Sequence, residues 1–598
     1  MTGVVAMLTA FGPVSVSVAQ TPSASGSSSG EKVTLTVGVP GDMVAPNPFK
    51  ACCGYEYEML FNAFDMLFHF SKEDLTPVPG LAESCEPDAA NLVWTCKIRS
   101  GVMWSDGEPL TSEDIAFTYR FIVDNKLSSF SDYLPFNPTF ETPDPTTLIW
   151  TSEEPTFAPT VPPWVPIVPE HIWSQYDGTD AKTIKSVDVL ADGPMVGSGP
   201  FVLTEWEPGQ FWKMSANKSY WGGTPTIDEI VYRVFDNHEA MVQALKAGEI
   251  DFADDLTTTL FNALEGEDNI ATNAATPSSF TNLAWNFGSP DMPNDTHNTA
   301  IEDLAFRQAV EYAIDKQAIV DSVFQGNAEV GTTITLPSSP WHYEPPVEDQ
   351  YTFDLAKANQ ILDDAGYADT DDDGIREDPK NGEPLSFDIV TLTDSAGSND
   401  SGKLMVGWMK EIGVEFNLQP VSENKAYALW ADGDFDAYIW GWGGDPDPDF
   451  ILSIFITSQC LSWSDGCYSD AQFDQWYKEQ KTIFDRDERK AFIDNMQSYL
   501  YEQSPEVVLV YPNYLQAYRT DTFTGYVPTP ADNGALLFGW GPYSYINLTP
   551  VSATAGGPAP GGDSGGSNAL VYIGIGAVLL IGLVLLASRR RRADEDRV

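Results

Sequence analysis

Residues 440 to 450, with the sequence WGWGGDPDPDF, place three carboxylates directly behind two tryptophans. In the residues before them, apolar and polar positions alternate, which predicts a strand whose second face carries Tyr438, Trp440 and Trp442. Prolines follow Asp445 and Asp447, and a residue before proline is pushed toward extended geometry. The pattern therefore predicts a carboxylate held at the end of a strand beside aromatic side chains. Such a group suits the binding of a ligand cation.

Within this stretch we expect Asp445 to contact a ligand, together with Trp442, Trp440, Tyr438 and Gly443. A carboxylate that loses water on ligand binding gains from an ammonium partner, and hydrogen bonds to charged groups contribute about 1.5–3 kcal/mol. The aromatic rings would add apolar walls. For Trp440 and Tyr438 a place in the core is an equally open alternative.

The other two acids of the stretch have structural interpretations. Asp449 directly precedes the apolar run FILSIFI and is predicted to cap a helix there. Asp447 is expected to be exposed.

A second acidic stretch, DTDDDGIRED at residues 369 to 378, resembles a calcium loop. Its Asp369, Asp371, Asp373 and Gly374 fit the loop pattern, but Lys380 stands where the bidentate glutamate is required. We interpret the stretch as a solvated acidic turn and predict no metal site.

Catalytic patterns are missing from the sequence. It contains no P-loop, HExxH or dinucleotide-binding glycine pattern, and no two of its five histidines have the spacing of a metal-ligand pair. We therefore predict neither catalysis nor a cofactor.

The six cysteines form three close pairs, which predicts disulfides in an oxidising compartment. Cys85 and Cys96 lie on two predicted strands joined by a polar turn, and Cys460 and Cys467 could close a short loop. The adjacent Cys52 and Cys53 could form a vicinal bond or remain thiols.

Composition limits the partners. The chain has 598 residues and a formal net charge of -55, from 87 acidic and 32 basic residues. This surplus of acid argues against nucleic acid and anionic lipid as partners of the main body. Because 42% of residues are hydrophobic, we expect a globular protein with acidic residues on its surface and not a disordered chain.

The two ends predict export and anchoring. Residues 1–19 form a signal-like segment without a basic start, so we expect Met1 to lie inside a longer signal sequence whose true start is upstream. Residues 569–587 carry no charge and would span roughly 28 Å as a transmembrane helix. A basic tail, residues 588–598, follows and is expected in the cytoplasm. Residues 549–568 form a Gly/Pro/Ser linker.

The body alternates helical and strand-like segments, which predicts an α/β fold. Helices are indicated from Thr111, from Asn237 to Gly248, over residues 306 to 324, and from Asp354 to Gly366. Strand-like runs include KVTLTVGVP, EIVYRVF, LSFDIVTLT and PEVVLVYP.

Several motifs, in order, resemble those of the extracellular solute-binding proteins of family 5, the peptide/nickel class that serves ABC importers. They include WSDGEPLTSEDIAFTY, GSGPFVLTEWEPG, ALKAGEIDFA, FRQAVEYAIDKQAIV and GWGGDPDP, and the likeness extends from about residue 33 to 547. The resemblance implies a bilobal, periplasmic-binding-protein-like clam with an extra subdomain. Lobe I would combine residues 31–60, 197–275 and 510–548, with 61–196 as its inserted subdomain and 276–509 as lobe II. Hinge crossings would lie near residues 276–283 and 504–511.

The same resemblance implies function. In peptide-binding members an aspartate at the position of Asp445 holds the α-ammonium of the ligand. We therefore expect a monomeric, membrane-anchored receptor that captures oligopeptides outside the cell or in the periplasm and delivers them to an ABC permease. Oligosaccharide binding by the same architecture, or a surface sensor or adhesion module, are the alternatives.

Overall fold

The computed structural model describes residues 32 to 551, apart from residues 52–53, 128–129, 131–133, 135–136, 156–164 and 394. The predicted signal-like segment, transmembrane helix, basic tail and Cys52–Cys53 pair lie outside the described residues. Within the described range, no helix combines the length and apolarity that a bilayer crossing requires.

One seven-stranded mixed sheet is built from segments far apart in the chain. Its central strand β1 pairs in parallel with β10 and β11, and the other pairings are antiparallel. In sheet order the strands are β12 (Ile270–Ala275), β19 (Tyr514–Arg519), β11 (Phe252–Ala253), β1 (Thr34–Val39), β10 (Glu229–Val234), β9 (Phe211–Ala216) and β8 (Phe201–Glu207). Helices α1 (Gly54–Ala63), α5 (His238–Ala247), α6 (Thr258–Asn262) and α15 (Tyr543–Asn547) belong to this part of the chain.

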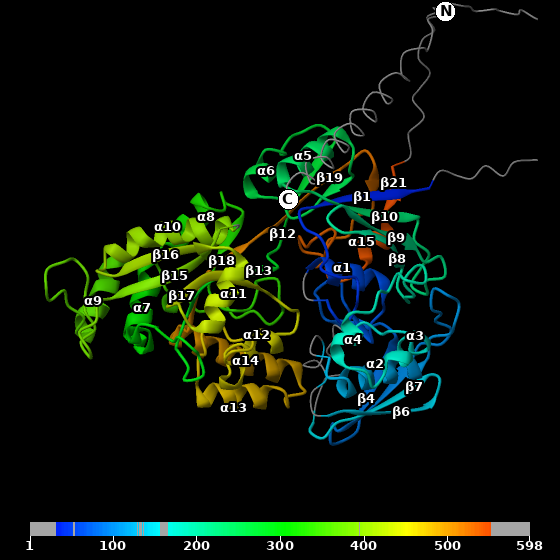
Figure 1. Cartoon of the computed structure of the whole chain (residues 1–598), viewed down its shortest axis with the longest axis horizontal. Helices are drawn as coiled ribbons and strands as arrows, with labels where there is room; N and C mark the ends of the chain where they lie inside the picture. Colours follow the sequence, from blue (N-terminus) through cyan, green and yellow to red (C-terminus); the bar gives the residue numbers. More distant parts are fainter. Residues whose placement is uncertain are drawn as a thin grey trace, which may run out of the picture. The chain divides into compact units, whose positions relative to one another are not determined.

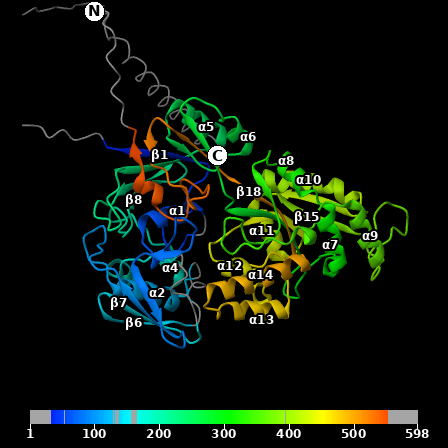
Figure 2. The same ribbon diagram turned by 180° about the vertical axis from the view of Figure 1, so that it is seen from behind.

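A four-stranded antiparallel sheet follows β1 in the chain and packs with helix α2 (Ser112–Asp124), as Figures 1 and 2 show. Its strands, in order, are β4 (Ala82–Pro87), β5 (Val93–Ile98), β7 (Thr147–Thr151) and β6 (Thr139–Asp144). The same region holds the short pair β2 (Phe68–Phe70) and β3 (Pro77–Pro79), and the helices α3 (Glu170–Trp173) and α4 (Ala181–Lys185). Cys85 pairs with Cys96 across β4 and β5, and their disulfide confirms the prediction.

A six-stranded sheet carries the WGWGG stretch. In sheet order its strands are β14 (Ala328–Val330), β18 (Glu506–Pro512), β13 (Ser279–Trp285), β17 (Ala437–Gly443), β15 (Ser386–Leu392) and β16 (Glu415–Val421). Around it lie α7 (Leu304–Ala313), α8 (Lys316–Ser322), α9 (Leu355–Ala365), α10 (Ala396–Lys410), α11 (Glu423–Asp432), α12 (Asp449–Ser453), α13 (Ala471–Gln480) and α14 (Arg486–Gln503). Helix α10 covers β15, β16 and β17. A two-stranded pair, β20 (Phe523–Thr524) with β21 (Thr549–Pro550), ends the described chain.

The chain passes between the seven-stranded and six-stranded sheets twice. The first passage, residues 276–278 between β12 and β13, lies within the predicted crossing. The second is at Asn513 between β18 and β19, not over residues 504–511 as expected. The reason is that β18 continues to Pro512, where it still pairs with β14.

Predicted boundaries of three helices are confirmed by their caps. Thr111 and Asp114 form a reciprocal capping box at the start of α2. Asn237 caps α5, which ends at the left-handed Gly248, and Asp354 and Gly366 bound α9 in the same way.

The helix expected over residues 306 to 324 is instead two helices, α7 and α8. Ile314 is extended, and the Asp315 side chain accepts a hydrogen bond from the Ala318 backbone N–H, so a new helix begins there. The periodic pattern continues across the break because both helices pack on the same core.

Candidate ligand site on β17

Strand β17 separates two environments. It lies between β13, which is antiparallel to it, and β15, which is parallel. Ile439 packs into the core shared with Met405 and Met409 of α10. Tyr438, Trp440 and Trp442 lie on the opposite face, as the alternation predicts.

The aromatic side chains on this second face form a continuous chain of edge contacts. The ring centroids of Trp440 and Trp442 are 5.6 Å apart, and Tyr427 of α11 lies 5.7 Å from Trp440. At the other end, Phe450 of α12 is 5.9 Å and Trp463 is 6.4 Å from Trp442. Such spacings give favourable edge-to-face geometry. Trp440 and Trp442 are half-buried, which suits walls of a ligand site.

Tyr438 does not fit its predicted role as a ligand contact. It is only 3% exposed, packs with Ala426 and Leu429 of α11, and donates its hydroxyl hydrogen to the Ala426 carbonyl oxygen at 2.7 Å. Tyr438 therefore belongs to the core and supports Trp440 from within. This was the alternative left open by the alternating pattern.

Gly441 lets the backbone of β17 lie close to β13. A Cβ atom on Gly441 would lie 2.2 Å from the Phe280 carbonyl oxygen, so no larger residue fits there. Gly443, predicted to contact ligand, ends the strand with an exposed backbone, and a Cβ there would have its nearest neighbour 3.9 Å away.

Asp445 follows two residues after the end of β17 and is half-buried. Its negative charge acts on Tyr57 of α1, whose pKa is raised to about 12, first by burial, then by Asp445 and Glu56. The carboxylate and the phenol are thus within electrostatic reach of each other, although 388 positions separate them in the chain, from 57 to 445. A ligand cation beside Asp445 would meet a preformed negative potential.

The two other acids of the stretch differ from expectation. Asp447 is not exposed: it forms a two-pronged ion pair with the buried Arg489, at 2.6 and 2.9 Å. Its Oδ1 also accepts the Asp449 backbone N–H at 3.0 Å. Asp447 therefore provides the cap that the sequence suggested for Asp449.

Asp449 is the first residue of α12, and its side chain makes no cap. The carboxylate instead accepts hydrogen bonds from Gln480 at 2.6 Å and Tyr477 at 3.3 Å, and lies 3.0 Å from the Lys481 ammonium. Asp447 and Asp449 together fix the turn that carries Asp445.

A buried polar cluster beneath the tryptophans was not foreseen. The Trp442 Nε1–H donates to Asp465 Oδ2 at 2.7 Å, and Asn282 of β13 donates to Glu506 Oε2 of β18 at 2.6 Å. Burial raises the pKa of Asp465, and burial and the charge of Asp465 raise that of Glu506. A charged residue inside the apolar run PEVVLVYP was the one signal that could have pointed to this cluster.

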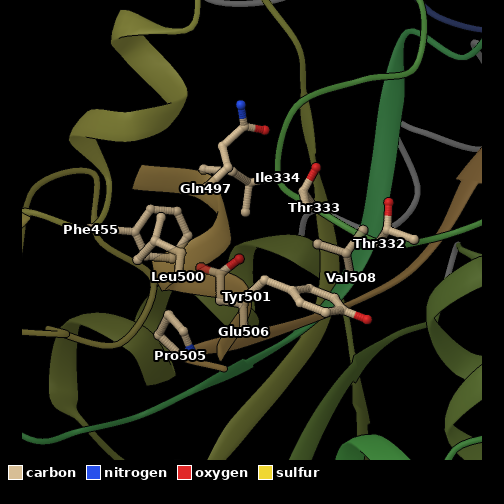
Figure 3. A pocket seen from close by; sticks show the side chains of 10 residues that line it. All are labelled: Thr332, Thr333, Ile334, Phe455, Gln497, Leu500, Tyr501, Pro505, Glu506 and Val508. Atoms are coloured by element: carbon tan, nitrogen blue, oxygen red, sulfur yellow. The ribbon is translucent and has the colours of Figure 1, made fainter. Parts of the chain in front are cut away.

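Glu506 is also one of the residues that line a small cavity (Figure 3). The cavity has room for about one water. Its lining comes from loop, helix and strand residues: Thr332, Thr333, Ile334, Phe455, Gln497, Leu500, Tyr501, Pro505, Glu506 and Val508. These ten include none of the predicted ligand residues, so the cavity is not the predicted site.

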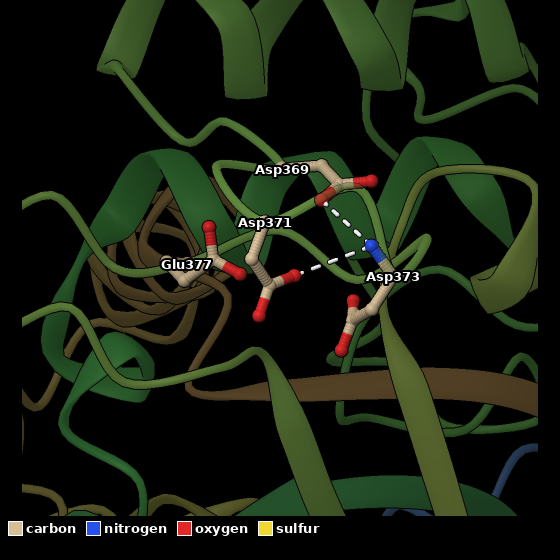
Figure 4. Close-up of side chains that lie close together, drawn as sticks. All are labelled: Asp369, Asp371, Asp373 and Glu377. Atoms are coloured by element: carbon tan, nitrogen blue, oxygen red, sulfur yellow. Dashed lines mark hydrogen bonds between the residues drawn. The ribbon is translucent and has the colours of Figure 1, made fainter.

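The acidic loop at residues 369 to 378 brings four carboxylates together (Figure 4). One oxygen from each of Asp369, Asp371, Asp373 and Glu377 lies within 4.8 Å of the others. The Asp373 backbone N–H is 3.2 Å from both Asp369 and Asp371, as in a self-capped turn. Lys380 lies 3.6 Å from Asp303.

The chain is similar to known solute-binding proteins in sequence and in fold. The family model described as "Bacterial extracellular solute-binding proteins, family 5 Middle" matches residues 76–462, which include β17 and Asp445. The oligopeptide-binding protein AppA of Bacillus subtilis is 29% identical over 464 residues, which cover 75% of this chain and 81% of AppA. The nickel-binding periplasmic protein of Escherichia coli is 24% identical over 468 residues, covering 73% of this chain and 82% of that protein.

Solved structures show the same fold. AppA from B. subtilis in complex with a nonapeptide superimposes with a TM-score of 0.71 at 25% identity, covering 87% of this chain and 99% of that one. NikZ from Campylobacter jejuni in complex with Ni(L-His) gives 0.72 at 21% identity, covering 87% and 100%. The α/β, periplasmic-binding-protein-like architecture is therefore confirmed, while the ligands of these relatives differ.

Proposed function

Since this chain belongs to the bacterial extracellular solute-binding proteins of family 5, we propose that it captures oligopeptides and delivers them to the permease of an ABC importer. The proposal rests on one observation above the others. Asp445 stands at the end of an aromatic-faced strand, and its charge reaches Tyr57 on α1. A peptide ammonium would be held by this carboxylate.

The choice of oligopeptides is supported by a relative. AppA, at 29% identity, is named an oligopeptide-binding protein and was solved with a nonapeptide. The nickel-binding relative has lower identity, 24%. The aromatic chain along Trp440 and Trp442 would also serve as a stacking surface for an oligosaccharide, which is the second candidate ligand.

For the mechanism, we propose that the predicted lobes act as a clam. Lobe I comprises residues 31–60, 197–275 and 510–548 with 61–196 inserted, and lobe II comprises 276–509. A ligand that contacts both lobes stabilises the closed form only through contacts that the open form lacks. The permease would then recognise the closed form.

For location, we propose that residues 569–587 anchor a monomer to the membrane by a single helix. The body, residues 20 to 568, would lie outside the cell or in the periplasm, and the basic residues Arg589 to Arg592 would hold the tail in the cytoplasm. The long Gly/Pro/Ser linker would let the body reach the permease.

The test compares Asp445→Asn with Asp434→Asn, which removes an exposed acid from the turn before β17. Mass spectrometry of small molecules that copurify with the body identifies the ligand, and calorimetry measures its affinity for each variant. We expect Asp445→Asn to weaken peptide binding more than tenfold and Asp434→Asn to leave it unchanged. Copurified sugar, or peptide binding that is indifferent to Asp445→Asn, would overturn the proposal.

A further inference from the structure

The disulfide loop, residues 460–467, lies against the aromatic chain of β17. The predicted bond between Cys460 and Cys467 is present and closes it. Within the loop, Trp463 is 45% exposed, although its ring is 5.5 Å from that of Phe450 and 6.4 Å from that of Trp442.

The rest of this loop is fixed to the fold at several points. Asp465 accepts the Trp442 Nε1–H at 2.7 Å, and the Ser464 carbonyl oxygen accepts the Trp430 Nε1–H at 3.1 Å. Gly466 lies so close to β13 that a Cβ atom would be 1.7 Å from the Trp285 carbonyl oxygen, and its own carbonyl accepts the Phe287 N–H. These contacts hold the loop in one conformation and leave the indole of Trp463 at its surface.

A large apolar side chain held rigidly at the surface gives area for binding with little loss of side-chain entropy on association. Trp463 continues the row of rings from Trp440 and Trp442, and the same β17 segment leads into Asp445 three residues after Trp442. An apolar surface beside a carboxylate complements a ligand that carries an amine and, close to it, an apolar group.

We propose that the disulfide loop is a specificity element, in which Trp463 selects oligopeptides with an aromatic or large aliphatic side chain within the first three residues. This inference rests on the proposed function. Asp465 acts as a positioning residue, because it holds Trp442 and the loop together. The disulfide keeps Trp463 placed before the ligand arrives.

The experiment uses penta-alanine and three variants with phenylalanine at position 1, 2 or 3, titrated into the whole body by calorimetry. For the natural protein we expect one phenylalanine peptide to bind about tenfold more tightly than penta-alanine. Trp463→Ala should reduce this ratio to below about threefold, with penta-alanine affinity little changed. The matched control is Phe353→Ala, which removes another exposed aromatic residue, 42% exposed and outside the aromatic chain, and should keep the ratio.

A second variant, Cys460→Ser with Cys467→Ser, tests the preorganisation. It keeps Trp463 and the contacts of Asp465, Ser464 and Gly466 but removes the covalent closure of the loop, so we expect an intermediate ratio. Thermal melts of all variants establish that they are folded. Equal affinity for all four peptides in the natural protein, or a ratio unchanged by Trp463→Ala, would overturn the inference alone. If the folded natural protein binds none of the peptides, the proposed function fails as well, and the inference with it.

Discussion

Arg489 of α14 holds Asp447 with both of its terminal nitrogens, Nη1 2.6 Å from Oδ2 and Nη2 2.9 Å from Oδ1. The guanidinium side chain is 5% exposed, its Nε–H donates to Gln480 at 3.0 Å, and its planar group lies 4.7 Å from the centre of the Trp341 ring. This buried pair fixes the turn that presents Asp445.

Asp447→Asn is therefore expected to lower the free energy of unfolding substantially. The change leaves a buried guanidinium without its counter-charge, and such losses amount to about 3–5 kcal/mol. Urea unfolding should show a free energy of unfolding lower by about that amount. The double variant Asp447→Leu with Arg489→Met removes both charges and should recover part of the loss. If Asp447→Asn unfolds at the same urea concentration as the natural protein, the pair has no structural role.

Glu58 of α1 should make stability depend on pH. Burial raises its pKa to about 7, while hydrogen bonds from Tyr545 and Asn62 oppose the rise only partly. A carboxyl with a raised pKa binds its proton more tightly when folded, so its contribution is complete below pH about 4.5 and is lost as the pH rises through about 7.

We expect Glu58→Gln to remove this dependence. The difference in unfolding free energy between the variant and the natural protein should grow in favour of the variant from pH 5 to pH 8, by about 3 kcal/mol at most. Unfolding in urea at both pH values measures it. A constant difference across this range would contradict the assignment of a raised pKa to Glu58.

Ligand binding is expected to make the body more compact, because closure of two lobes shortens their separation. Small-angle scattering of the body with and without saturating peptide measures the radius of gyration. The Asp445→Asn variant, at the same peptide concentration, should remain in the open form. One unchanged scattering curve for the natural protein under saturating ligand would refute the clam mechanism.

Calcium should leave thermal stability unchanged. The four carboxylates of Asp369, Asp371, Asp373 and Glu377 lie close together, but Lys380 takes the place of the bidentate ligand at the twelfth loop position. Melting curves in chelator and in millimolar CaCl₂ should overlap once ionic strength is matched with magnesium. A melting temperature raised by calcium alone, through binding to the folded form, would contradict the interpretation as a solvated turn.

Local signals in the sequence predicted local structure well. The capping box of Thr111 and Asp114 and the left-handed ends at Gly248 and Gly366 depend on residues only a few positions apart. The register that joins Cys85 to Cys96 follows from one short hairpin. The alternation before Trp440 correctly predicted which side chains share a face of β17.

What the sequence could not predict depends on distant partners. Asp447 is only partly exposed because it pairs with Arg489, 42 positions away, and Tyr438 is buried because α11 covers its face. The acids Asp465 and Glu506 meet only because the disulfide loop that carries Asp465 folds against the sheet that contains β18. The spacing of apolar residues also continues through Ile314, so it predicted one helix where the chain ends α7 and begins α8.

The most direct test of the central claim concerns the ligand's amine. Calorimetry would compare a copurified or library peptide with the same peptide acetylated at its N-terminus, which removes only the positive charge. We predict that the free peptide binds more than tenfold more tightly to the natural protein, and that Asp445→Asn abolishes this difference. Equal affinity of the two peptides for the natural protein would contradict the assignment of Asp445 as the site of ammonium capture.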